Sequence, residues 1–333
     1  LWKEVPVHFP VTIGSQTKNN KVYKKHIQPL YGSKDIRDIT QLDVQQTLNH
    51  VATYCVQQTV RNVKTDWHRI FQVAQINKIA VMDLTTLVKT PEAMKTTERS
   101  VKEENITAED FDSFISFMNE YGGYLPNETE RIYNRTILVY LMKVMRVSGI
   151  RLQEARALSR NDITIEEETG HNSENDQENI QEYALIHIRH SAGTTYDNDN
   201  AIRKTKTKWS VRSVPVFDEG LIWIKEVLEY SKHELIFAKY SGEPFTSTEV
   251  ADYVRRVKKK WKKVSGKDVD IYTTLMRKAY ASDLYRDKVN QAAVKKLMGH
   301  KFESTSINWY AKSDDEEIKE AAKKRTYKKN KKV

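Results

Sequence analysis

The stretch SGIRLQEARAL, residues 148–158, follows a long apolar segment and begins a short charged one. Gly149 is expected to end the preceding helix, because glycine readily adopts the left-handed backbone conformation that closes many helices. Arg151 then lies at the entry to a new helical turn, and Glu154 comes one turn later. An Arg–Glu pair at this spacing is a common surface pair that contributes little to stability. The stretch by itself therefore fits either a structural or a functional role.

The residues before this stretch predict a separate N-terminal domain. The chain has 333 residues, which suits two domains better than one. The opening as far as Ser33 is polar and is interpreted as extended. Residues 40–55 and 59–80 then carry apolar side chains near a 3.6-residue period, with Thr40 as N-cap and Leu42 in the first apolar stripe. We expect a helical domain over residues 1–100, and a charged linker over residues 89–105 that has a proline and no apolar period.

The remaining residues, 104–333, predict a second and larger domain that begins with a helix capped by Thr107. Most of it has the helical period, but residues 183–190 and 209–217 alternate as strands do. The acidic segment 169–182 is expected to be a loose surface loop. The fold class is therefore mainly α with a small antiparallel β-sheet (α+β).

Composition limits the partners that the chain can have. There are 55 Lys and Arg against 45 Asp and Glu, a net charge of +10. A basic surplus favours a polyanionic partner, because each cation that meets a phosphate releases a counterion. The single cysteine, Cys55, cannot form an internal disulfide, which indicates a reducing compartment. No apolar run approaches the roughly 20 residues that cross a bilayer, so we expect no membrane partner and a cytoplasmic, nucleoid-associated location.

Three further segments carry candidate chemistry, in a fixed order along the chain. KTKWSVRSVPV, residues 206–216, places Lys206 and Lys208 in alternation, as on a hairpin strand; lysines there also fit an ordinary edge strand. TTLMRKAYAS, residues 273–282, places Arg277 on a helix among apolar neighbours, where it must meet an anion or backbone carbonyls. GHKFESTSINWY, residues 299–310, joins a Gly-His pair to a tyrosine.

Taken in order, these four segments resemble the boxes of the tyrosine recombinase (phage integrase) family, as found in integrases of mobile elements. The resemblance covers most of the chain and implies a helical core-binding domain followed by a catalytic domain. It implies five catalytic residues, which are Arg151, Lys206, Arg277, His300 and Tyr310. Glu154 matches an acidic position of the first box and has a supporting role.

The resemblance implies that DNA strands are cleaved and rejoined through a covalent 3′-phosphotyrosine intermediate. Arg151 and Arg277 would hold the phosphate oxygens, where guanidinium forks favour the transition state. Tyr310 would attack the phosphate, Lys206 would protonate the departing 5′ oxygen, and His300 would bind a phosphate oxygen or orient Tyr310. The intermediate conserves the phosphodiester energy, so neither a cofactor nor a metal is expected.

The sequence departs from the family pattern at two places. Thr274 stands where a histidine usually precedes the second arginine, so that Lys278 or a water substitutes for the imidazole, or the enzyme is slower. The interval from His300 to the tyrosine is also one residue longer than the commonest spacing. Tyr280 and Tyr285 fit helix packing better than nucleophilic attack.

Basic side chains predict where double-stranded DNA binds. The two domains are expected to close around the duplex as a clamp, and the tail 311–333 to pack on a neighbouring protomer, so that dimers to tetramers form on DNA. The segment RRVKKKWKK, residues 255–263, is expected to line the backbone, with Trp261 among its cations. The candidate DNA-binding residues are Arg61, Lys64, Arg69, Lys208, Arg255, Arg256, Lys258, Lys259 and Lys260.

Two other functions stay open at this point. A telomere resolvase shares the chemistry but makes hairpin ends. A DNA-binding protein with a decayed active site is the second, and Thr274 is the residue that supports it.

Overall fold

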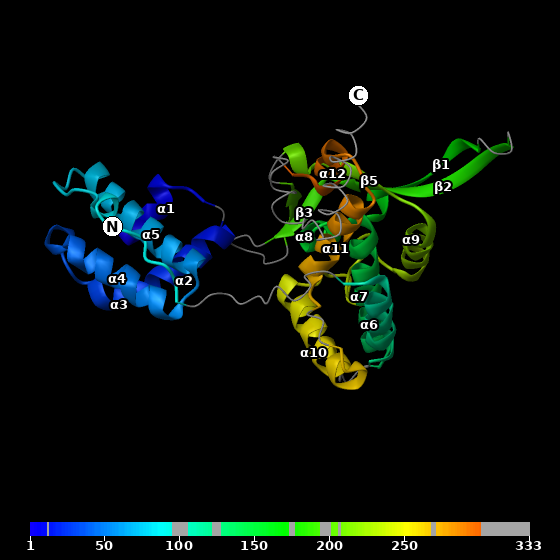
Figure 1. Ribbon diagram of the computed structural model, residues 1–333, viewed down its shortest axis with the longest axis horizontal. Coiled ribbons are helices and arrows are strands. Elements are labelled where there is room, and N and C mark those ends of the chain that lie inside the picture. The colour runs from blue at the N-terminus through cyan, green and yellow to red at the C-terminus, as the bar shows by residue number, and fades with distance from the viewer. Residues whose placement is uncertain are drawn as a thin grey trace, which may run out of the picture. The chain divides into compact units, whose positions relative to one another are not determined.

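The computed structural model describes residues 1–11, 13–94, 106–121, 128–172, 177–193, 201–205, 208–267 and 271–300, and only the backbone of residues 170–172, 177–179 and 208 (Figure 1). The chain divides into two compact units. The first is formed mainly by Leu1–Lys102, and the second mainly by Glu103–Gly193 and Asn200–Val333.

The N-terminal unit is helical from its second residue. Its elements are η1 (Trp2–Glu4), α1 (Val5–His8), α2 (Ile13–His26), α3 (Gln28–Tyr31), η2 (Ile36–Asp38), α4 (Gln41–Tyr54), α5 (Gln57–Ile76) and η3 (Leu84–Thr86).

The prediction of an extended opening is wrong, because tertiary packing forms helices that the weak local pattern does not indicate. Trp2 stacks on Tyr23 of α2 with ring centroids 4.3 Å apart, and its Nε1 donates to the Asn20 side chain at 2.8 Å. Ile27, between α2 and α3, is buried in the core of the unit. These packing contacts stabilise α2, although most of its residues are polar and its own sequence pattern indicates a helix only weakly.

The predictions for α4 are confirmed except at one residue. Thr40 caps the helix and forms a capping box with Asp43, in which each side chain accepts from the other's backbone N–H. Val44 and Leu48 are fully buried, but Leu42 is 63% exposed. Leu42 is two residues from Val44, which turns it about 200° away from the buried stripe.

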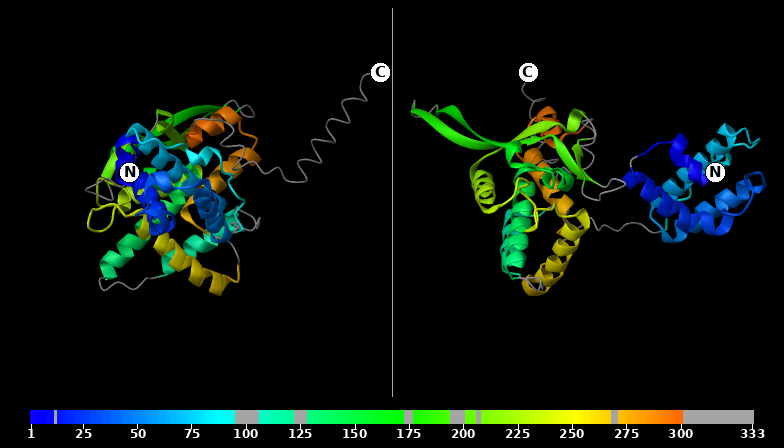
Figure 2. Two further views of the ribbon diagram at one scale, coloured as in Figure 1. Left: turned by 90° about the vertical axis from the view of Figure 1, so that its left-hand side faces the viewer. Right: turned by 180° about the vertical axis from the view of Figure 1, so that it is seen from behind.

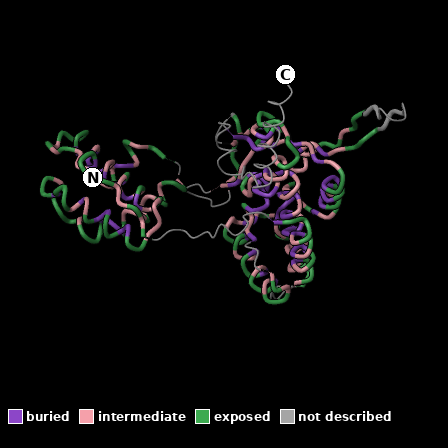
Figure 3. Tube along the Cα trace, in the orientation of Figure 1, coloured by how far each residue is buried: buried purple, intermediate pink, exposed green. Residues whose placement is uncertain are grey.

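Helix α5 is the central helix of the unit. Its predicted stripe is confirmed, since Val60, Val63, Ile70 and Phe71 are buried and Trp67 stacks on Phe71. Figure 3 shows this alternation of buried and exposed positions along the helices.

Part of the predicted linker belongs to the unit. The backbone N–H of Met94 donates to Ala52 of α4 at 2.8 Å, and that of Ala93 donates to the Gln57 side chain of α5 at 2.8 Å. Residues 89–94 are therefore held on the first unit, and residues 95–105 lie outside the described part.

The second unit is built around α7. Its helices are α6 (Ala108–Glu120), α7 (Glu128–Ser148), α8 (Leu152–Ala155), η4 (Arg160–Asp162), η5 (Lys208–Ser210), α9 (Asp218–Tyr230), α10 (Ser247–Ser265), α11 (Thr273–Arg286) and α12 (Gln291–Met298). Thr107 caps α6 as predicted, by accepting from the Asp110 backbone at 3.1 Å. Helix α7 packs against α6, α9 and α11; the right-hand view of Figure 2 shows the helices of this unit from behind.

Among the described residues, five strands form two antiparallel sheets. One has the order β1 (Ile163–Asn172), β2 (Gln177–Ile188), β5 (Arg212–Val216); the other pairs β3 (His190–Gly193) with β4 (Ala201–Lys204). The predicted class, mainly α with a small antiparallel sheet, is confirmed. Among the described residues no helix is both long and apolar enough to cross a bilayer.

The prediction of a loose loop over residues 169–182 is wrong. Strands β1 and β2 pair continuously from Ile163 opposite Ile186 to Asn172 opposite Gln177. Residues 173–176 lie outside the described part of the chain. Figure 1 shows this hairpin extending from the body of the unit. An antiparallel pair tolerates polar residues because its backbone groups bond across the strands while its faces meet water.

Candidate active site

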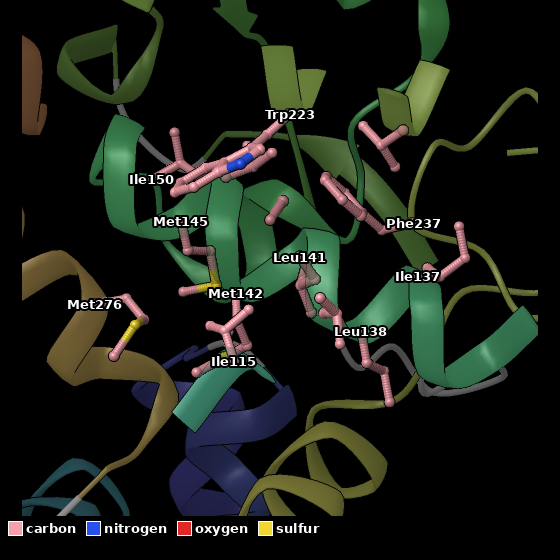
Figure 4. Close-up of a cluster of buried hydrophobic side chains, with 14 of the residues drawn as sticks. Ile115, Ile137, Leu138, Leu141, Met142, Met145, Ile150, Trp223, Phe237 and Met276 are labelled. Carbon is pink, nitrogen blue, oxygen red and sulfur yellow. The ribbon is translucent and has the colours of Figure 1, made fainter. Parts of the chain in front are cut away.

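Arg151 is the first residue of the site and is fixed by its neighbours. It is the N-cap of α8, and its side chain is 39% exposed. Ile150 before it is fully buried in the core that α7 and α11 share (Figure 4). The Arg151 guanidinium donates to Glu154 Oε1 at 2.8 Å and to the Gly299 carbonyl at 3.4 Å, so it reaches the end of α12.

Arg277 lies on α11, and its side chain also reaches the end of α12. Met276 before it is fully buried in the same cluster (Figure 4). Arg277 is 5% exposed and donates to the Gly149 carbonyl at 2.5 Å and to the Met298 carbonyl. Its Nη2 lies 3.1 Å from His300 Nε2. The buried helical arginine therefore has the array of carbonyls that the sequence requires of it.

Glu154 connects the first arginine to a third one. Its carboxylate accepts two bonds from Arg212 of β5, at 2.9 and 3.1 Å, besides the bonds from Arg151. Both side chains are almost fully buried, at 4% and 2% exposed. The interpretation as an exposed surface pair is thus wrong. Burial opposes ionisation of Glu154, but the hydrogen bonds and charge of Arg212, with Arg151, outweigh it and hold the pKa at about 2.

Arg212 is the functional candidate that sequence reasoning did not single out. Besides Glu154, it donates to the Leu297 carbonyl at 2.6 Å and to the Ser210 carbonyl at 3.1 Å. The signal was available in the alternation of β5, where Arg212, Val214 and Val216 all face the buried side. An arginine in the inward register of a strand must be paired.

Three guanidiniums and one carboxylate, those of Arg277, Arg151, Arg212 and Glu154, lie near His300 and leave a surplus of positive charge. His300 adds none at neutral pH: burial, followed by the nearby charges of Arg277, Arg151 and Arg212, lowers its pKa to about 4. A neutral imidazole beside Arg277 can accept or donate according to its tautomer. The site is therefore suited to an anion with several oxygens, such as a phosphodiester.

Two glycines allow the backbone to pass close to side chains around the site, Gly149 close to Tyr280 and Gly299 close to Arg212. Gly149 has φ of +62°, and a Cβ there would lie 2.2 Å from the Tyr280 ring. Gly299 has φ of +60°, and a Cβ there would lie 3.1 Å from Arg212 Nη1. Both positions favour glycine by conformation, and the first also by space.

The supporting residues on α11 separate into exposed and buried positions. Thr274 is exposed, one turn before Arg277, whereas Lys278 is buried at 7%. Tyr280 is partly buried, and burial raises the pKa of its hydroxyl although Arg212 and Arg277 lie near. Tyr280 and Tyr285 pack against the small cluster of Ala281, Val294 and Met298, in agreement with the interpretation as packing residues.

Three sequence predictions fall outside the described residues. They concern Lys206, Tyr310 and the tail 311–333. Lys208 is described by its backbone only, and it lies in η5 rather than on a hairpin strand. Strand β4, which pairs with β3, ends at Lys204, and β5 begins at Arg212, so Lys208 lies on neither strand.

Helix α10 places Trp261 on the face opposite most of its cations. Trp261 is buried and meets Phe114 edge to face, with ring centroids 5.7 Å apart, so its placement among the cations is wrong. The buried stripe of Val254, Val257 and Trp261 requires the opposite face to be polar. That face exposes Arg255, Arg256, Lys259 and Lys260, and Lys258 is half-buried beside it.

The three basic candidates of α5 do not share one face. Arg61 and Lys64 line a pocket of the N-terminal unit. Arg69 instead lies 3.6 Å from the buried carboxylate of Asp66. Burial raises the pKa of that carboxyl to about 7, although the charge of Arg69 opposes the shift.

Residues 104–317 match the sequence profile described as the Phage integrase family. Among curated proteins, Transposase A from transposon Tn554 of Staphylococcus aureus is 25% identical over 183 residues, which is 54% of this chain and 44% of the relative. The chain thus aligns with less than half the length of this relative.

Solved structures share the fold at low identity. The Tn1549 transposon integrase in complex with transposon right end DNA is 17% identical, with a TM-score of 0.69 over 97% of each chain. A lambda integrase dimer bound to a COC′ core site is 14% identical, with a TM-score of 0.63 over 94% of this chain and 95% of that one.

Proposed function

The chain belongs to the phage integrase family, and from this premise we propose that it is a site-specific DNA recombinase of a mobile element. It cleaves and rejoins DNA through a 3′-phosphotyrosine intermediate. The observation that carries the proposal is the convergence of Arg151, Arg277 and His300, which come from three segments far apart in the sequence and meet at the end of α12.

The chemistry follows from that geometry. Arg151 has the more exposed guanidinium and binds a non-bridging phosphate oxygen; Arg277, whose guanidinium is positioned by two carbonyls, binds the same phosphate. These donors stabilise the negative charge that grows as the phosphate is attacked, and losing one is worth about 3–4 kcal/mol of barrier. His300, neutral at physiological pH, binds a phosphate oxygen or orients the nucleophile.

Tyr310 and Lys206 complete the proposed mechanism. Tyr310 attacks the phosphorus and expels the 5′ oxygen, to which Lys206 donates a proton. Thr274 cannot perform the acid–base role of the usual histidine, so buried Lys278, or a water, takes it.

Double-stranded DNA is the proposed substrate and partner. The N-terminal unit serves as core-binding domain, and the residues from 104 onward as catalytic domain, with the exposed cations of α10 on the DNA backbone. The relatives named above include an integrase dimer on DNA, which supports assembly of this chain into dimers and tetramers around the duplex. Packing of the tail 311–333 on a neighbouring protomer would couple cleavage to assembly. We place this activity in the cytoplasm, at the nucleoid.

A nicked suicide duplex carrying the ends of the mobile element tests the proposal. The nick lets the cleaved fragment diffuse away, so the covalent adduct accumulates and shifts the protein on a denaturing gel. We expect the adduct with the wild-type chain and with Tyr240→Phe, a matched loss of one exposed hydroxyl in the same unit. We expect none with Tyr310→Phe.

The threonine at position 274, which replaces the usual histidine, favours one alternative, a DNA-binding protein with a decayed site. The same experiment decides between them: duplex binding without any adduct supports the decayed protein. Hairpin ends from one inverted-repeat site would instead identify a telomere resolvase.

A further inference from the structure

A pocket on the N-terminal unit has the composition of an anion site. It has a volume of about 310 Å³ and lies between α5 and the segment that follows η3. Among the described residues that line it, none is acidic; they are Arg61, Lys64, Thr65, His68, Thr85 and Thr90.

The pocket side of α5 is set by helical spacing. Arg61, Lys64 and His68 lie three and four residues apart, on one face of the helix. The opposite face buries Val63 and Trp67 in the core. The helix therefore cannot rotate its basic face away without exposing core residues.

The opposite wall of the pocket, residues 88–93, is held by several hydrogen bonds. Lys64 Nζ donates to the Val88 carbonyl at 2.8 Å, and the Gln45 side chain bonds both the N–H and the C=O of Lys89 at 3.0 Å. The Gln57 side chain bonds the Pro91 carbonyl at 3.1 Å and the backbone of Ala93. Thr90 lies between Lys89 and Pro91, whose backbones are held by these hydrogen bonds. A wall fixed before the ligand arrives loses little entropy on binding.

The donors of the pocket remain available for a ligand. No described residue pairs with the exposed Arg61 guanidinium. Lys64 commits one donor to Val88 and keeps two more. His68 Nδ1 bonds Asp83, whose other oxygen accepts from Thr85 Oγ1 at 2.6 Å. Asp83 thus fixes the orientation of the His68 ring through Nδ1, and Asp83 does not bond the other ring nitrogen, Nε2.

We infer that this pocket binds one phosphodiester group of the DNA backbone, with Arg61, Lys64 and His68 as its donors. The inference rests on the proposed function for the identity of the polymer. The inference adds a binding site for a single phosphate to the first unit. It also assigns a ligand-binding role to His68, which the sequence did not suggest. It also separates Arg61 and Lys64 from Arg69, whose guanidinium lies against Asp66 instead.

The salt dependence of DNA affinity tests the inference in the full chain. Each phosphate contact adds about 0.9 to the slope of log K against log salt for duplex DNA. Fluorescence anisotropy with a short duplex of arbitrary sequence, measured over a series of KCl concentrations, gives this slope. We expect Arg61→Gln to reduce its magnitude by about 0.9 and to weaken binding several-fold, and His68→Gln to weaken binding to a smaller extent.

Arg37→Gln is the matched control. It removes the same charge from the same unit, but Arg37 is already paired with Asp35 at 2.7 Å. We expect its slope to equal that of the wild type. Equal slopes for Arg61→Gln and Arg37→Gln would overturn the inference and leave the proposed function standing, whereas a wild-type chain that binds no duplex would overturn both.

Inorganic phosphate distinguishes a DNA phosphate from a free one. Saturable shifts of the His68 ring resonances with inorganic phosphate, together with equal DNA slopes for Arg61→Gln and Arg37→Gln, would assign the pocket to free phosphate and refute the inference.

Discussion

Arg212→Gln will destabilise the second unit and slow DNA cleavage, although Arg212 is not among the residues that contact substrate in the proposed mechanism. The change removes the bonds at 2.9 and 3.1 Å to the buried carboxylate of Glu154 and the bond at 2.6 Å to the Leu297 carbonyl. Removing one partner of a buried ion pair costs about 3–5 kcal/mol, because the other charge stays buried without compensation. For a unit of this size that lowers the melting temperature by roughly 10 °C.

The assay is thermal unfolding followed by circular dichroism, with Arg255→Gln as matched control. Arg255 pairs with Asp252 at 2.8 Å, but on the surface, where such pairs contribute about 1 kcal/mol or less. Glu154→Gln combined with Arg212→Gln should cost at least about 1 kcal/mol less than the sum of the single changes, since the two groups act on each other. Suicide-substrate cleavage by Arg212→Gln, measured below its melting temperature, should fall by about two orders of magnitude as Arg151 loses its fixed position.

Equal melting temperatures for Arg212→Gln and Arg255→Gln would refute this reasoning. So would strict additivity of the two buried changes, because it would show that the carboxylate does not depend on Arg212.

Three further predictions follow from the same structure. Gly149→Ala should lower stability by more than the roughly 1 kcal/mol of a left-handed alanine, because its Cβ would overlap the Tyr280 ring; a loss from Gly149→Ala that is equally large in the wild type and in a Tyr280→Ala background would contradict this. The raised pKa of Asp66 means that the folded state holds its proton more tightly, so the N-terminal unit should lose up to about 4 kcal/mol as pH rises from about 4 to about 7; urea unfolding of Asp66→Asn should lack that loss. The lowered pKa of His300 acts in the other direction: stability present above about pH 6.5 should fall by up to about 3 kcal/mol as pH drops towards 4. His300→Gln should flatten that part of the curve in the same urea experiment, and an unchanged curve would contradict the assignment.

Local pattern determined much of this protein. The period of α5, the Thr40 cap and the helix end at Gly149 are each set by neighbours within a turn or two, so the sequence predicts them correctly. The order of the four boxes likewise identified the family, because family motifs are properties of the linear chain.

Tertiary structure alone decided what those motifs touch. The bond from Arg277 to Gly149 spans 128 residues, and that from Arg212 to Glu154 spans 58, so no local period could indicate either. The same holds for the helices before Ser33 and for the polar hairpin of β1 and β2, whose formation depends on partners rather than on their own apolar pattern. Periodicity shows which face of an element is buried, whereas the free energy of burying a charge depends on the partner that the whole fold brings to it.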